Sequence, residues 1–129
     1  IVDLLKKHKP KLVVIQLGGN MHFFKDQEIR ESTTQLLTKG GEAQASCIWV
    51  GPPPGDKRPQ PRFSEVYTML KELVEGQGCR FIDSREILNP APKGGDGIHL
   101  DTMKNGLEAS KKWTEVIARE IFTHYSKLK

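Results

Sequence analysis

The sequence predicts an α/β protein in which a parallel sheet lies between two layers of helices. Short apolar runs alternate along the chain with longer segments whose apolar residues recur at helical spacing. The repeated order of strand and then helix favours parallel strands with helices on both faces of the sheet. The first two apolar runs also stop abruptly at glycines or prolines, as buried strands do where they meet a loop.

The first half of the chain is predicted to hold two helices and two strands. Helical spacing at the start predicts a helix over residues 1–8, and the apolar run after it predicts a strand over Lys11–Leu17. A second helix is predicted over Asp26–Lys39, with Gly40-Gly41 as its stop. A short apolar strand follows at Ser46–Val50. The residues expected to face inward from the second helix are Ile29, Leu36 and Leu37.

The second half is predicted to hold two longer helices and one strand. The proline-rich segment Gly51–Gly55 cannot continue a regular element. A helix over Arg62–Glu75 and a strand over Cys79–Asp83 follow, and a long helix over Thr102–Tyr125 comes last. The residues expected inside are Val66, Met69, Leu70 and Leu73 from the first of these helices, and Leu107, Trp113, Val116, Ile117 and Ile121 from the last.

The composition is that of one globular domain, which we place at residues 1–129. The net charge is +4, but the lysines are scattered apart from a cluster at Lys6–Lys11, and a basic stripe interleaved with aromatic residues is not visible. We therefore expect no nucleic-acid partner. No apolar run approaches the length of a membrane span. Two cysteines and four scattered histidines give no metal-ligand spacing, so we expect neither metal nor cofactor.

The residues suited to chemistry follow the ends of the predicted strands. The first strand ends at Gly18-Gly19-Asn20, the second ends at the proline-rich segment, and the third leads to Asp96 and His99. Ligands of open α/β sheets bind beyond the carboxyl ends of the strands. We therefore expect a site at this edge of the sheet.

Two of these segments have complementary chemistry. Asp96 stands three residues before His99, close enough in a tight turn to accept a hydrogen bond from one ring nitrogen. The other nitrogen of His99 is then available as a general base. The Gly18–Asn20 segment presents backbone N–H groups and a side-chain amide, and both are donors that stabilise negative charge on a carbonyl oxygen under attack.

These segments resemble two sequence blocks of the SGNH (GDSL-type) hydrolase family. The matching residues are Gly18-x-Asn20 and Asp96-x-x-His99-Leu100, with Gly106 in the opening of the last helix. The resemblance implies a flavodoxin-like three-layer fold and a serine ester hydrolase. It also implies that Asn20 and Gly18 serve the oxyanion hole, that His99 is the base and that Asp96 orients it.

The sequence departs from this family in two respects. In the family, the nucleophile is a serine in a Gly-Asp-Ser block near the first strand. This chain has no Gly-Asp-Ser. The chain opens at Ile1 inside a predicted helix, so we expect it to lack an N-terminal βαβ unit of about 30 residues or more. That unit and its serine are expected from a segment outside this chain or from a second chain. Met21 also stands where the family commonly has Asp.

The expected substrate is a small acyl ester, such as an acetyl group on a carbohydrate or cell-wall polymer, because no long apolar lid for a lipid chain is visible. The isolated chain is expected to be inactive. Two alternatives stay open, namely a lipase or thioesterase of the same family and a catalytically inactive binding module with the same fold. A nucleotide-binding module is disfavoured, because no phosphate-cradling glycine motif is present.

Three further sets of residues have two interpretations each. His22, Phe23 and Phe24 either line a substrate pocket together with Pro52 or pack under the next helix. Ser84 follows Asp83 as a nucleophile would, but we expect it to cap the turn Arg85–Leu88. Cys47 and Cys79 form either a disulfide, which would favour a secreted or periplasmic protein, or two buried thiols.

Overall fold

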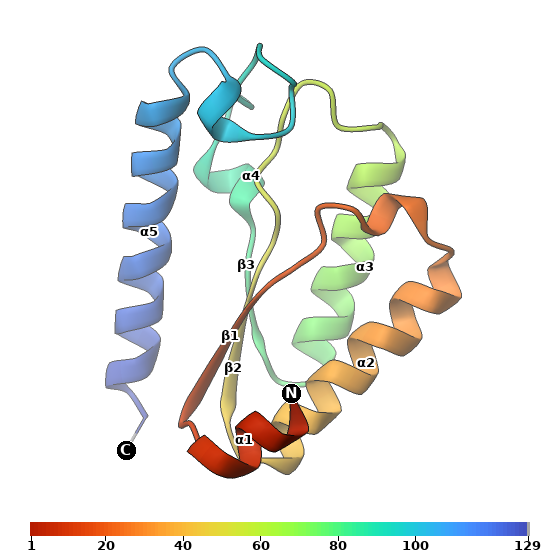
Figure 1. Cartoon of the computed structure of the whole chain (residues 1–129), viewed down its shortest axis with the longest axis vertical. Helices are drawn as coiled ribbons and strands as arrows, with labels where there is room; N and C mark the ends of the chain where they lie inside the picture. Colours follow the sequence, from red (N-terminus) through yellow and green to blue (C-terminus); the bar gives the residue numbers. More distant parts are fainter. Residues whose placement is uncertain (129) are drawn as a thin grey trace.

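The computed structural model describes residues 1–128 and has the predicted α/β fold (Figure 1). Its strands are β1 (Leu12–Gln16), β2 (Ser46–Val50) and β3 (Arg80–Ile82). They form one parallel sheet in the order β1-β2-β3, in which Val14 pairs with Ile48. All three strands therefore end at the same edge of the sheet, as the positions of the candidate site residues require.

Helices α2 (Asp26–Glu42) and α3 (Arg62–Gly76) cover one face of the sheet. Trp49 and Leu70 are fully buried in the core between these helices and the sheet. A shorter helix, α1 (Val2–His8), precedes β1 and buries only Leu5. The other buried members of this core are Ile15, Ile29, Leu37, Val66, Met69, Val74 and Cys79.

The other face of the sheet is covered by α5 (Gly106–Ser126). Its residues Trp113, Ile117 and Ile121 pack against a second core of Ile48, Val50 and Ile82. The short helix α4 (Ser84–Ile87) and the 3-10 turns η1 (Met21–Phe23) and η2 (Leu100–Thr102) connect the larger elements. The predicted three-layer arrangement is confirmed. None of the helices in the described part is long and apolar enough to cross a membrane.

Two predicted helix boundaries are wrong. Helix α2 continues through Gly40 and Gly41 to Glu42, because both glycines lie on an open surface and cost only about 1 kcal/mol each in a helix. The last helix begins at Gly106, since the extended backbone at Met103 and the left-handed Asn105 interrupt it before that point. Helix α3 ends only one residue later than predicted.

Two residue assignments are also corrected. Leu107 is 86% exposed, because it lies about 120° around α5 from the inward stripe that begins at Trp113. Asp83, rather than Ser84, caps α4 by accepting a 2.9 Å hydrogen bond from the Arg85 N–H. Ser84 is fully buried and donates to the Gly51 carbonyl at 2.5 Å, so its hydroxyl is a structural group.

The outer edge of β1 is open. Among residues 1–128 only β2 pairs with this strand, which leaves its other row of backbone groups without a strand partner. Val14 on β1 is 43% exposed and Leu17 just after it is 51% exposed. This edge is thus a place where a further strand fits.

Cys47 and Cys79 form a disulfide that links β2 to the residue before β3, with Cα atoms 4.9 Å apart. Of the two interpretations of these cysteines, the structure has the disulfide. Neither sulfur is therefore available as a nucleophile.

Removing this disulfide is expected to destabilise the chain by about 2–4 kcal/mol, because the bond closes a loop across 32 residues and restricts the unfolded state. The double variant Cys47→Ala/Cys79→Ala tests this by urea unfolding. A reductant is expected to produce the same loss in the wild-type chain and no change in the variant. Equal stability of oxidised and reduced wild-type chain would contradict the prediction.

Candidate active site

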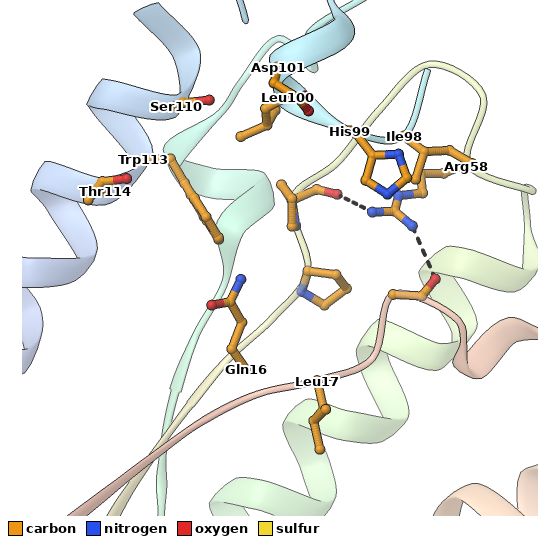
Figure 2. A pocket seen from close by; sticks show the side chains of 13 residues that line it. Gln16, Leu17, Arg58, Ile98, His99, Leu100, Asp101, Ser110, Trp113 and Thr114 are labelled. Atoms are coloured by element: carbon orange, nitrogen blue, oxygen red, sulfur yellow. Dashed lines mark hydrogen bonds between the residues drawn. The ribbon is translucent and has the colours of Figure 1, made fainter. Parts of the chain in front are cut away.

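Loops from the ends of all three strands surround one cavity at the predicted edge of the sheet (Figure 2). Its volume is about 380 Å³. Arg58, Ile98 and His99 lie on one side of it, and Trp113, Ser110 and Thr114 face it from α5. The remaining lining residues are Gln16, Leu17, Gly19, Pro52, Pro53, Leu100 and Asp101.

Asp96 and His99 meet as predicted from their spacing. Asp96 Oδ2 lies 2.6 Å from His99 Nδ1, while Asp96 Oδ1 accepts from the backbone N–H groups of Ile98 and His99, each at 2.8 Å. Gly97 between them has φ +72°, a conformation that favours glycine. Thr102 Oγ1 also donates to Asp96 Oδ1 at 3.0 Å. The turn therefore holds one carboxylate against one imidazole.

The pKa of Asp96 is held well below its usual range. The main cause is the hydrogen bond with the His99 side chain, followed by those from the backbone N–H groups of His99 and Ile98. Asp96 is consequently an anion at neutral pH and accepts the proton on His99 Nδ1. This leaves His99 Nε2 as the nitrogen that accepts a proton, the tautomer that a general base needs.

The Gly18–Asn20 loop begins where β1 ends. Gly18 has φ +125°, and a Cβ there would lie 3.0 Å from Leu70 Cδ1, so the backbone and the packing both require glycine. The Leu17 carbonyl accepts from Trp49 Nε1 at 3.1 Å, and the Gly18 carbonyl accepts from the Met21 N–H at 3.1 Å. The loop is thus held by the buried Trp49 at its start and by the Met21 N–H at its end.

Of this loop, the structure brings Gly19 to the cavity that His99 lines. Gly18 is buried, and the exposed Asn20 begins η1 without a capping hydrogen bond from its side chain. Neither residue is among those that line the cavity, so their oxyanion roles stay predictions.

Only one of the other predicted pocket residues lies at the cavity. Pro52 lines the cavity, whereas His22 and Phe23 do not. The rings of His22 and Phe23 contact each other at a tilt of 43° with centroids 4.0 Å apart, and Phe23 is 78% exposed. A role for this pair in substrate binding also stays a prediction.

Sequence reasoning missed Arg58, Ser110 and Thr114. Arg58 follows the proline-rich segment and is buried beside the cavity, which no spacing in the sequence indicated. Ser110 and Thr114 lie on α5 across the cavity from His99 (Figure 2). Within the described residues, neither hydroxyl is hydrogen-bonded to His99, and no cluster of three metal-ligating side chains occurs.

Comparison with known proteins gives relatives but no matching family profile. The chain is 27% identical to an arylesterase of Vibrio mimicus over 95% of its own length and 61% of the relative. It is 29% identical to the thioesterase 1/protease 1/lysophospholipase L1 of Escherichia coli K12, over 74% of its own length and 49% of the relative. The chain thus spans about half to three-fifths of the relatives it matches. With the parallel sheet and the Asp96–His99 pair, these similarities confirm the resemblance: the chain is similar to the C-terminal portion of the SGNH (GDSL-type) hydrolases.

Proposed function

We propose that the chain is the C-terminal part of a serine ester hydrolase. His99 is the general base, Asp96 orients it, and the Gly18–Asn20 loop supplies oxyanion donors. The observation that carries this proposal is the 2.6 Å pair of His99 Nδ1 and Asp96 Oδ2 beside a cavity at the carboxyl edge of a parallel sheet.

In the proposed reaction, a serine hydroxyl from outside this chain attacks the ester carbonyl while His99 Nε2 takes its proton. Asn20 and the Gly18 backbone donate to the oxygen that becomes negative in the tetrahedral intermediate. The intermediate collapses to an acyl-enzyme, and His99 gives the proton to the departing alcohol. Water then repeats the sequence, and the acid leaves with the serine restored.

The open edge of β1 supports an external source for this serine. A further parallel strand on that edge would end beside the Gly18–Asn20 loop, and the residue after it would enter the space next to His99. The relatives are also longer than this chain, which covers 61% and 49% of them. We propose that a segment of the whole protein, or a second chain, pairs with β1 and carries the nucleophile.

The proposed substrate is a small acyl ester, such as an acetyl group on a carbohydrate or cell-wall polymer. The cavity of about 380 Å³ lies near the lower limit of ligand pockets. The arylesterase and thioesterase names of the relatives favour ester chemistry in general and keep a longer acyl group or a thioester as the second candidate. An inactive binding module is the third, because none of the described hydroxyls is hydrogen-bonded to the imidazole ring of His99.

The first test compares the isolated chain with the whole protein on p-nitrophenyl acetate. The isolated chain is expected to show no hydrolysis above background, because it lacks the nucleophile, whereas the whole protein hydrolyses the ester. A series of p-nitrophenyl esters with longer acyl chains then separates the acetylesterase from the lipase interpretation. Activity in the isolated chain that disappears on Ser110→Ala would place the nucleophile on α5 instead, with Ser84→Ala as the matched control.

A further inference from the structure

Arg58 lies beside the site and has an unusual environment. It is on the loop between β2 and α3 and is only 7% exposed. Its Nη1 donates to the Gly19 carbonyl and its Nη2 to the Pro53 carbonyl, each at 3.1 Å (Figure 2). Its guanidinium lies 5.1 Å from the centre of the Phe63 ring. Among the described residues, its Nε is buried without a hydrogen-bond partner.

This arrangement is unfavourable for stability alone. Burial removes water from the cation and lowers the pKa of Arg58, although an arginine starts so high that it stays charged at neutral pH. In the described part of the chain no carboxylate forms a salt bridge with it, and its hydrogen-bond partners are two carbonyl dipoles. A buried cation without an ion-pair partner is a group that proteins retain mainly at functional sites.

The Gly19 carbonyl is the informative partner. It belongs to the same planar peptide as the N–H of Asn20, so fixing the oxygen also fixes the direction of that N–H. The carbonyls of Leu17 and Gly18 accept hydrogen bonds from Trp49 and from the Met21 N–H. Arg58 binds the next carbonyl along the chain, that of Gly19, which directly precedes Asn20. Among the described residues, Arg58 is the one donor to the Gly19 carbonyl.

The loop that carries Arg58 also contacts the Asp96–His99 turn. The Lys57 N–H donates to the Gly97 carbonyl at 3.2 Å. Gly55 packs so closely on this carbonyl that a Cβ would collide with it. The loop between β2 and α3 therefore contacts both halves of the site, which come from distant parts of the sequence.

We propose that Arg58 is a positioning residue that sets the oxyanion loop against His99. It holds the Gly19–Asn20 peptide, and its own loop holds the Asp96–His99 turn. This proposal rests on the proposed function, because it assigns Arg58 to the geometry of that same site. Arg58 acts through the loop and takes no proton itself.

The test measures kcat and KM for p-nitrophenyl acetate in the whole protein. Arg58→Ala is expected to lower kcat by about 10²-fold, as for the loss of one oxyanion donor, with KM within about twofold. Dilute guanidinium is expected to restore part of the lost kcat in this variant. Arg58→Lys keeps the charge but not the two-pronged donor geometry, so it is expected to be nearly as slow.

Arg62→Ala is the matched control. Its Nη2 also donates to a loop carbonyl, that of Phe24 at 2.6 Å, but not to the peptide before Asn20. We expect its kcat to stay within about twofold of wild type. An equal fall in Arg62→Ala, or a full kcat in Arg58→Lys, would overturn the positioning role.

Amide hydrogen exchange in the present chain separates this proposal from the proposed function. Arg58→Lys is expected to speed exchange of the Met21 N–H, which donates to the Gly18 carbonyl across the Gly19–Asn20 peptide at 3.1 Å, and to leave the β2 amides unchanged. Unchanged exchange at Met21 would overturn the proposal whatever the activity. An inactive whole protein with faster exchange at Met21 would instead refute the ester hydrolase, while Arg58 would still be shown to hold the loop.

Discussion

Replacing His99 with alanine in the whole protein is expected to lower kcat by several orders of magnitude, on the order of 10⁴-fold. In the proposed mechanism the imidazole Nε2 takes the serine proton, and Asp96 Oδ2 lies 2.6 Å from the other ring nitrogen. KM is expected to change little, because the proton transfer occurs only as the transition state forms. Steady-state kinetics with p-nitrophenyl acetate measures both constants.

Two further variants serve as a comparison and a control for this result. Asp96→Asn is expected to cost less than His99→Ala, since water partly replaces an orienting group. His124→Ala is the matched control, because this histidine contacts Ser46 at 2.8 Å at the other end of the sheet. It is expected to keep wild-type kcat. If His99→Ala and Asp96→Asn both keep near-normal kcat, the assignment of the pair is wrong.

Replacing Asn20 with alanine is expected to lower kcat by about 10²-fold, the effect of one lost oxyanion donor. KM is expected to stay nearly constant, because the negative charge that an oxyanion donor stabilises exists only in the transition state. Asn20→Asp removes the amide donors at nearly the same size and is expected to be at least as slow.

Met21 affects the size of this loss. It packs against the core, and its N–H holds the Gly18 carbonyl, but its side chain offers no hydrogen bond to the loop as an Asp would. A loosely held amide contributes less, so a loss of about tenfold still agrees with the oxyanion role. A raised KM with unchanged kcat would instead make Asn20 a ground-state binding or turn residue.

The fold followed from the sequence where local periodicity and burial agree. Strand β2 occupies the predicted residues Ser46–Val50, because the apolar run Cys47–Val50 between a serine and a glycine-proline segment favours one placement in a sheet. The boundaries of α2 and α5 were less predictable. Gly40 and Gly41 do not stop a helix that neighbouring contacts already support, and the backbone at Asn105 depends on a loop with no sequence signature.

Some residues of the site could likewise be predicted from the sequence and others could not. The Asp96–His99 contact spans three residues within one turn, so sequence spacing sufficed to predict it. Arg58 was missed because its partners are backbone carbonyls, one of them 39 residues away, and any residue supplies such a carbonyl. Contacts between a side chain and a distant backbone leave no pattern of residue types.

The two tryptophans of the chain occupy places that make them separate optical reporters. Trp49 is fully buried between the sheet and its helices, so its fluorescence senses water only when the core opens. Trp113 forms part of the cavity wall and donates to Ser84 Oγ at 2.8 Å, so its emission senses whatever fills the cavity. With Trp49→Phe the native fluorescence becomes a titration signal for occupancy of the site, and with Trp113→Phe it becomes a signal for unfolding alone.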